Sequence, residues 1–322
     1  MGPVDPLKYA TGYHAPVLCN TVVEILITDP AGTYVDCTLG GGGHSHALLD
    51  VLAPEATVIG IDRDPEAIRE ARRRLSADVD SGRFVTVNGN FADLTEIARA
   101  TEFSDVDGIL FDFGVSSHQL DIPERGFSYR DSGGLDMRMG DDTNLTASEI
   151  VNSWSYEDLR SVLYEYGEES RAGLIARDIV AARPINDTVQ LAEVVRRRVR
   201  GPNAPKVLSR IFQALRVRVN DELTAIRRAL VATVSLLKPG GRCLAMSYHS
   251  LEDRIVKRFF RYGNFEGVAQ KDFYGNVLTP WEVLTRRPLT ADDEEIEANP
   301  RARSVRIRAA QRLATEATPT TH

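Results

Sequence analysis

Short apolar runs alternate with amphipathic stretches through the first third of the chain. Continuous runs such as Val58 to Ile61 suit strands that are buried on both faces of a sheet. Strands that alternate with helices form βα units, and successive βα units build a parallel sheet. The strands that we expect span residues 33–39, 57–62, 83–88 and 106–112, and the helices between them span 44–52, 66–75 and 92–100.

The alternation stops after the fourth strand. Between Ser116 and about Arg218 the pattern is helical, with polar turns and no buried strand. It then resumes, and the last strand alternates in a way that suits a sheet edge. We therefore expect an open α/β sheet domain from residues 1–115 and 219–322, with a helical insertion at 116–218. The later helices are expected at 148–166, 174–182, 188–200 and 221–237, a turn at 238–241, strands at 242–247 and 304–309, and a disordered tail at 313–322.

Composition places the chain among ordinary folded proteins. Hydrophobic residues make up 43% of the 322 residues and charged residues 26%, which supplies a core and excludes a wholly disordered chain. No apolar run reaches the roughly 18 residues that span a bilayer, and the first residues lack a signal-peptide pattern. The three cysteines are far apart and form no CxxC pair, so we expect no disulfide framework and no cysteine zinc site. These features predict a cytoplasmic protein without a membrane partner.

The charge distribution changes what the net charge implies about partners. The formal charge is −7, yet residues 194–262 hold 16 basic and four acidic residues, a local charge of +12. Because the Debye length is roughly 8 Å in physiological salt, such a segment can attract a polyanion while the whole chain stays acidic. The alternative is a set of solvated helix faces that pair with acids elsewhere in the fold.

A run of four glycines, Gly40 to Gly43, follows the first strand. Glycine tolerates φ > 0 and lets a ligand approach the backbone closely. Asp62 ends the second strand about 20 residues later, where a carboxylate can accept hydrogen bonds from ribose hydroxyls. Together they predict a cofactor that carries a nucleoside, although a tight turn without a ligand is the alternative. Ser45 and His46 stand where GxGxxG needs its third glycine, which favours S-adenosylmethionine over a dinucleotide.

Two more side chains are expected at the carboxyl ends of these strands. Asp112 ends the fourth strand, where it would either join cofactor and acceptor or cap a neighbouring backbone. Phe91 follows the third strand and would either cover an adenine face or pack in the core. His44 and His46 are two residues apart, which suits no helical metal pair, so we predict no metal site.

Hydrolase chemistry is disfavoured. Ser250, His249 and Asp253 are near one another in the sequence, but no G-x-S-x-G elbow presents a serine.

Nine sequence runs, spread over nearly the whole chain, carry a resemblance to one family. They are HAPVL at 14–18, DCTLGGGGHS at 36–45, GIDRDP at 60–65, DGILFDFGVSS at 107–117, ERGFS at 124–128, LDMRM at 135–139, YEYGEE at 164–169, SYHSLEDRIVK at 247–257 and NPRARS at 299–304. In this order they are similar to the bacterial small-subunit ribosomal RNA methyltransferase H family, also called MraW. One departure is Tyr248, which stands where phenylalanine is common.

The resemblance implies a class I, Rossmann-like methyltransferase sheet with an inserted helical substrate-recognition domain. It implies an S-adenosylmethionine-dependent enzyme that methylates N4 of one cytidine in 16S rRNA, near the decoding site of the small ribosomal subunit. The cofactor contacts that it implies are Gly42, Gly43 and His44 at the methionine end, Asp62 at the ribose, Phe91 at the adenine, and Asp112 with Gln119 near the reacting end.

Asp112 is our candidate catalytic residue, because an acceptor that holds an N–H of cytosine N4 would take up developing positive charge. Amino-methyltransferases often have Asp/Asn-Pro-Pro-aromatic here, whereas this chain has Asp-Phe-Gly-Val at 112–115, so a role toward the cofactor alone stays open. Methylation at C5 needs a cysteine thiolate, and no cysteine is expected near the end of the fourth strand.

Two further alternatives come from other classes of protein: an RNA-binding module with a vestigial cofactor site, and a small-molecule NAD enzyme. RNA contacts are expected from the arginines of 196–200 and from Arg210, Arg216 and Arg218. The sequence leaves the oligomeric state open, a homodimer included.

Overall fold

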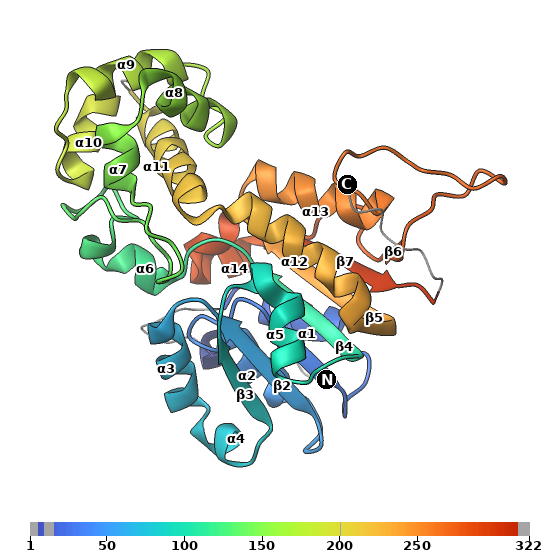
Figure 1. Ribbon diagram of the computed structural model, residues 1–322. Helices are drawn as coiled ribbons and strands as arrows, with labels where there is room; N and C mark the ends of the chain where they lie inside the picture. Colours follow the sequence, from blue (N-terminus) through green and yellow to red (C-terminus); the bar gives the residue numbers. More distant parts are fainter. Residues whose placement is uncertain (1–5, 10–15, 200, 315–322) are drawn as a thin grey trace. The chain divides into compact units, whose positions relative to one another are not determined.

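The structure is a computed structural model that describes residues 6–9, 16–199 and 201–314 (Figure 1). The predicted tail from 315 onward and the first two residues of the run at 14–18 lie outside these ranges. The chain divides into two compact units: a sheet unit, Met1–Gly114 with Leu223–His322, and a helical unit, Val115–Glu222. In the part of the chain described, no helix combines the length and apolar character that a membrane crossing requires.

The sheet unit holds a seven-stranded sheet in the order β3-β2-β1-β4-β5-β7-β6. The first five strands in that order are parallel, and β7 pairs antiparallel with both β5 and β6. Because the whole helical unit is inserted between β4 and β5, the predicted fold class is confirmed. The strands are β1 (Thr33–Asp36), β2 (Thr57–Asp62), β3 (Phe84–Asn88), β4 (Val106–Asp112), β5 (Leu237–Ser247), β6 (Trp281–Val283) and β7 (Arg306–Arg312).

Two sequence predictions about the last strands are wrong. The sequence predicts the final strand at a sheet edge, but β7 lies inside the sheet. The edge on that side is β6, which is too short to show a period. The turn expected at 238–241 lies within β5, which begins at Leu237. There the pairing of β4 with β5 shifts register, and Gly240 takes φ +85°.

Both faces of the sheet are buried, which explains the continuous apolar strands. Successive strand residues alternate between two cores: Val58 and Leu110 belong to one, and Ile59 and Ile109 to the other. The helix residues in the first core come from α1, α2 and α3, and those in the second from α5, α12 and α13. The helices of the sheet unit are α1 (Cys19–Leu26), α2 (Gly43–Leu49), α3 (Pro65–Arg74), α4 (Ser76–Asp80), α5 (Leu94–Ala100), α12 (Glu222–Leu236), α13 (Ser250–Tyr262) and α14 (Asp293–Ala298).

The helical unit has its own apolar core, built from the inner faces of its helices. The single helix expected at 148–166 is two helices, because Ser155 leaves the helical conformation and its hydroxyl caps the second one. Asp187 caps the helix that corresponds to the one predicted at 188–200, since its carboxylate accepts the Gln190 N–H. The helices of this unit are α6 (Ser117–Asp121), α7 (Ala147–Ser153), α8 (Tyr156–Glu165), α9 (Ala172–Ala181), α10 (Thr188–Arg196) and α11 (Ala204–Asn220).

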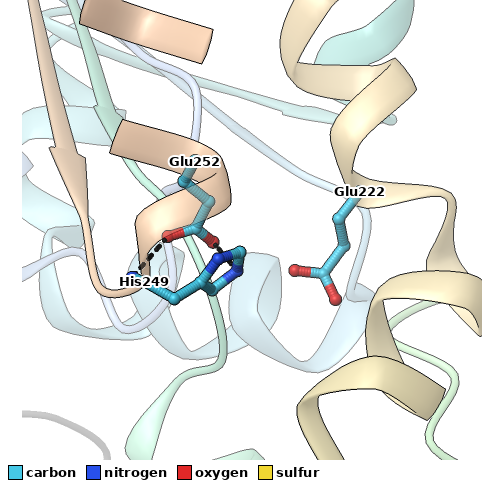
Figure 2. Close-up of side chains that lie close together, drawn as sticks. All are labelled: Glu222, His249 and Glu252. Carbon is cyan, nitrogen blue, oxygen red and sulfur yellow. Dashed lines mark hydrogen bonds and ion pairs between the residues drawn. The ribbon is translucent and has the colours of Figure 1, made fainter. Parts of the chain in front are cut away.

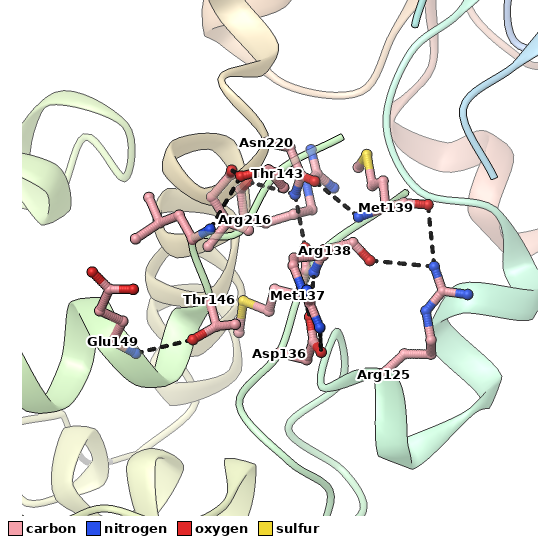
Figure 3. A network of polar contacts seen from close by, with 12 residues as sticks. Arg125, Asp136, Met137, Arg138, Met139, Thr143, Thr146, Glu149, Arg216 and Asn220 are labelled. Carbon is pink, nitrogen blue, oxygen red and sulfur yellow. Dashed lines mark hydrogen bonds and ion pairs between the residues drawn. The ribbon is translucent and has the colours of Figure 1, made fainter. Parts of the chain in front are cut away.

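A polar network fixes the loop at 135–139 to α11 (Figure 3). The Asn220 amide accepts a hydrogen bond from the Met139 N–H at 2.9 Å and donates one to the Met137 carbonyl at 2.7 Å. Arg138 forms two 2.8 Å hydrogen bonds with the Asp136 carboxylate. Since Asn220 is buried, its hydrogen bonds hold this loop from the interior of the helical unit.

Candidate functional site

The order of the sheet strands reverses between β1 and β4, which lie side by side. In open α/β sheets, ligands bind at the carboxyl ends of the strands beside such a reversal. The glycine turn (Gly40–Gly43) follows β1, and Asp62 and Asp112 end β2 and β4. The topology therefore brings these three predicted positions to the same edge of the sheet.

The glycine turn has a backbone that glycine accepts readily. Gly40 takes φ +49° and Gly42 takes φ +75°. A Cβ on Gly40 would meet no atom within 4 Å, so the backbone there borders open space. A Cβ on Gly43 would instead lie 2.9 Å from Pro16, so this glycine is needed for packing at the start of α2. The turn fits a ligand that approaches the backbone at Gly40.

Asp62 is joined to the glycine turn by a hydrogen bond. Its carboxylate accepts the Gly40 N–H at 2.8 Å on one oxygen and the Asp64 N–H at 2.9 Å on the other. Desolvation by the surrounding protein raises the pKa of Asp62 to about 6, and these two N–H donors oppose the rise. Each carboxylate oxygen can accept a second hydrogen bond, so the group can bind two ribose hydroxyls.

Asp112 lies between side chains from two other segments. The Tyr248 hydroxyl donates to Asp112 Oδ1 at 2.7 Å, and His44 Nδ1 lies 3.8 Å from Asp112 Oδ2. Burial raises the pKa of Asp112, and the neighbouring His44 and the Tyr248 hydrogen bond oppose that rise. The Asp112 N–H donates to Thr38 Oγ1 at 2.6 Å, which fixes the backbone beside β1. The result is a carboxylate of fixed orientation at the end of β4.

His44 is held by its other ring nitrogen. Nε2 lies 2.9 Å from the Val17 carbonyl, so Nε2 carries a hydrogen and donates it. Nδ1 is therefore the atom that faces Asp112. This buried histidine sits in the first turn of α2 and connects the glycine turn to Asp112.

The two remaining predicted cofactor residues lie in different units. Phe91 is half-buried in the sheet unit, with ring centroids 5.9 Å from both Phe111 and Phe113. Gln119 belongs to the helical unit, where it and Ser116 form the capping box of α6. Contact of either side chain with the cofactor remains a prediction.

In the sequence, Tyr248 is distinguished only by standing where phenylalanine is common. Its hydroxyl contacts a carboxylate 136 residues away in the chain, and no local pattern signals such a pair. The hydroxyl itself was the available signal, because a buried tyrosine oxygen needs a hydrogen-bond partner.

The residues after Tyr248 do not form a hydrolase triad. His249 Nε2 lies 2.9 Å from Glu252 Oε1 (Figure 2). The other Glu252 oxygen accepts the Tyr248 N–H at 2.8 Å. Asp253 binds Arg308, with 2.6 Å between Nε and Oδ1. His249 and Glu252 therefore start α13, and Asp253 serves a different ion pair.

The arginines predicted to bind RNA divide into two groups. Arg216 is mostly buried and pairs with Glu222 at 2.7 Å, so its charge is already neutralised within the unit, and its contact with phosphate stays a prediction. Arg198 pairs with Asp178, Arg210 lies 3.9 Å from Glu169, and Arg218 lies over the Trp154 ring. The exposed pair Arg196 and Arg197 form no ion pair within the described ranges, whereas position 200 lies outside them.

Replacing Tyr248 with phenylalanine should shift the pH dependence of a reaction that needs ionised Asp112. Loss of the donated hydrogen bond raises the pKa of Asp112 further. When the pH is lowered, the variant should therefore lose activity at a higher pH than the parent does. We expect a rate roughly tenfold lower on the acid side and nearly unchanged at high pH. Rate–pH profiles check this, with the exposed Tyr274→Phe as the matched control. An unshifted acid limb would show that the Tyr248 hydroxyl does not act on Asp112.

The family match and two named relatives of this chain indicate the same family. The model of the MraW methylase family matches residues 11–313. The Ribosomal RNA small subunit methyltransferase H of Flavobacterium johnsoniae is 43% identical over 304 residues, covering 94% of this chain and 98% of that protein. The protein of the same name from Thermomicrobium roseum is 45% identical over 321 residues, covering 96% of each. The match to a solved rRNA methylase from Streptococcus thermophilus covers 92% of this chain and 93% of that one, with 12% identity and a TM-score of 0.38.

Proposed function

Since this chain belongs to the MraW methylase family, we propose that it transfers the methyl group of S-adenosylmethionine to N4 of one cytidine in 16S rRNA, near the decoding site. The observation that carries the proposal is the match over nearly the full length of relatives named for the small-subunit rRNA. The experiment that tests it is transfer of a labelled methyl group from S-adenosylmethionine to purified small ribosomal subunits.

The residues at the carboxyl ends of β1, β2 and β4 fit the cofactor. Asp62 would accept the ribose hydroxyls, and the open backbone at Gly40 leaves room for the ligand. Gly42, Gly43 and His44 would hold the methionine end. In the proposal, Phe91 flanks the adenine, and Gln119 completes the binding site.

The chemistry requires alignment and a proton acceptor. S-adenosylmethionine supplies a methyl group on a positively charged sulfur, and the attacking nitrogen must lie in line with the breaking S–C bond. The N4 lone pair is delocalised into the cytosine ring, so N4 is a weak nucleophile. Asp112 would accept an N–H hydrogen bond from N4 and then take the proton as the N–C bond forms. Because burial raises the pKa of Asp112, this carboxylate is a stronger base than an exposed aspartate.

Methylation at C5 is the nearest rival reaction, and the cysteines argue against it. Cys19, Cys37 and Cys243 are all buried, and desolvation raises the pKa of each thiol, which disfavours the nucleophilic thiolate. Cys37 lies just after β1, and Cys243 lies within β5. None of them ends β4, but the Cys37 N–H donates to the Leu110 carbonyl of that strand at 2.9 Å, so the expectation that no cysteine lies near the end of β4 is wrong for Cys37.

A triple variant without cysteine, C19A/C37A/C243A, should therefore keep its methyl-transfer activity. Loss of buried side-chain atoms should lower thermal stability, since each change leaves space in a packed core. The rate per folded molecule, measured below the melting transition, should stay within about threefold of the parent. A loss of more than about 100-fold in the folded variant would favour a cysteine mechanism.

The alternative of an RNA-binding module with a vestigial cofactor site makes a different prediction. Such a protein would bind RNA but take up no S-adenosylmethionine, which titration calorimetry measures directly.

The enzyme that we propose must also unstack the target base to reach the site. Its RNA affinity should fall steeply with salt, because Arg196 and Arg197 are free to contact phosphates.

A further inference from the structure

The sheet unit contains a cavity of about 400 Å³ that the proposed reaction does not use. It lies between α13, the end of β6 and β7, and we call it the basic cavity. Phe260, Val283 and Thr285 contribute to its walls. Four cationic side chains also line it: Lys257, Arg261, Arg286 and Arg308.

The charge around the basic cavity is only partly neutralised. Arg308 is buried and binds Asp253 through two hydrogen bonds of 2.6 and 3.3 Å. Arg306 also approaches Asp253, at 3.4 Å, so two arginines share one carboxylate. Lys257, Arg261 and Arg286 are exposed, and within the described ranges none of them forms an ion pair. The mouth of the cavity therefore has an excess of positive charge.

The walls of the basic cavity combine apolar side chains with one hydroxyl group. Phe260 is buried and Val283 is half-buried, which gives the cavity an apolar surface. The Thr285 hydroxyl accepts the Ala309 N–H at 2.9 Å, and its own hydrogen is available to donate to a ligand. An apolar pocket with a few polar groups and a cationic mouth matches a nucleobase joined to a phosphate.

We propose that the basic cavity binds one nucleotide from a single-stranded segment of the substrate RNA. The base packs against Phe260 and Val283, and Lys257, Arg261 and Arg286 contact the phosphates. Tyr248, which hydrogen-bonds Asp112, precedes His249 at the start of α13. Given 1.5 Å per helical residue, Lys257 and Arg261 lie roughly 12 and 18 Å along α13 from His249. The site would thus hold the RNA away from Asp112. This inference rests on the proposed function and adds a substrate contact within the sheet unit.

The charge part of the proposal is tested with K257Q/R286Q in the full chain. The dissociation constant for small-subunit RNA should rise about tenfold. The slope of log affinity against log salt should fall by about 1.4, since each phosphate contact on a single strand contributes about 0.7. Affinity for S-adenosylmethionine should not change. The matched control is Arg99→Gln on α5, an exposed arginine without an ion pair in the described residues, which should behave as the parent does.

The base part is tested with Val283→Phe, which narrows the cavity at the wall that the base would contact and keeps every charge. RNA affinity should fall about three- to tenfold, with the salt slope unchanged. If the parent transfers methyl groups but the variants match it in RNA affinity and in the salt dependence of that affinity, this inference alone is overturned. A parent that neither binds RNA nor transfers methyl groups would overturn the proposed function and this inference together.

Discussion

Asp112→Ala should abolish methyl transfer, lowering kcat by about 10²- to 10⁴-fold. The substitution removes the carboxylate that would orient N4 and accept its proton. It also leaves the Tyr248 hydroxyl without its acceptor and removes the carboxylate beside His44. The measurement is single-turnover transfer of a labelled methyl group to purified small subunits.

Asp112→Asn separates a catalytic role from a role in holding the cofactor. The amide keeps the shape and can accept the Tyr248 hydrogen bond, but it cannot take a proton. If Asp112 acts on N4, this variant should bind S-adenosylmethionine nearly as the parent does and still lose most of its turnover. A large loss of cofactor affinity with near-normal kcat would give Asp112 a cofactor role only. Near-normal turnover of Asp112→Ala would remove the residue from the mechanism.

Asp62→Ala should weaken S-adenosylmethionine binding by about 100-fold or more. Two hydrogen bonds to a charged group are lost, each contributing about 1.5–3 kcal/mol. The Gly40 N–H also loses its acceptor, so the glycine turn is less well fixed. Titration calorimetry measures the effect, and a melting curve of the unliganded variant controls for folding. An unchanged dissociation constant would show that the ribose is not bound at Asp62.

The parent protein should show a pH dependence at the same residue. The carboxylate form of Asp62 accepts the ribose hydroxyls, and its pKa in the unliganded protein is about 6. As the pH falls below 6, the group protonates and cofactor affinity should decline. Above pH 7 Asp62 is almost fully ionised, so it should cause no further change in cofactor affinity. Asp62→Asn, which cannot ionise, should lose this dependence.

The strands of the parallel sheet could be predicted because burial on both faces gives them an unbroken apolar pattern. β2 (Thr57–Asp62) and β4 (Val106–Asp112) have the predicted bounds. The last strands could not be placed, since the order of antiparallel strands depends on side-chain packing between distant segments. β6 has three residues, fewer than a period-2 pattern needs.

The candidate site could be predicted only as far as local topology determines it. The glycine turn and Asp62 meet because a βαβ unit places them together, and the Gly40–Asp62 hydrogen bond agrees with this. The contacts of Asp112 with Tyr248 and His44 join segments that no spacing rule connects. Charge counting likewise identified Arg216 as basic but could not reveal that Glu222 neutralises it.

The most direct measurement is nucleoside mass spectrometry of small-subunit RNA after incubation with the protein and isotope-labelled S-adenosylmethionine. Chromatography against authentic standards separates N4-methylated from C5-methylated and 2′-O-methylated cytidine. The account predicts label on N4 of a single cytidine with the parent protein and none with Asp112→Ala. Label on C5 or on the ribose, or no label in the RNA at all, would contradict it.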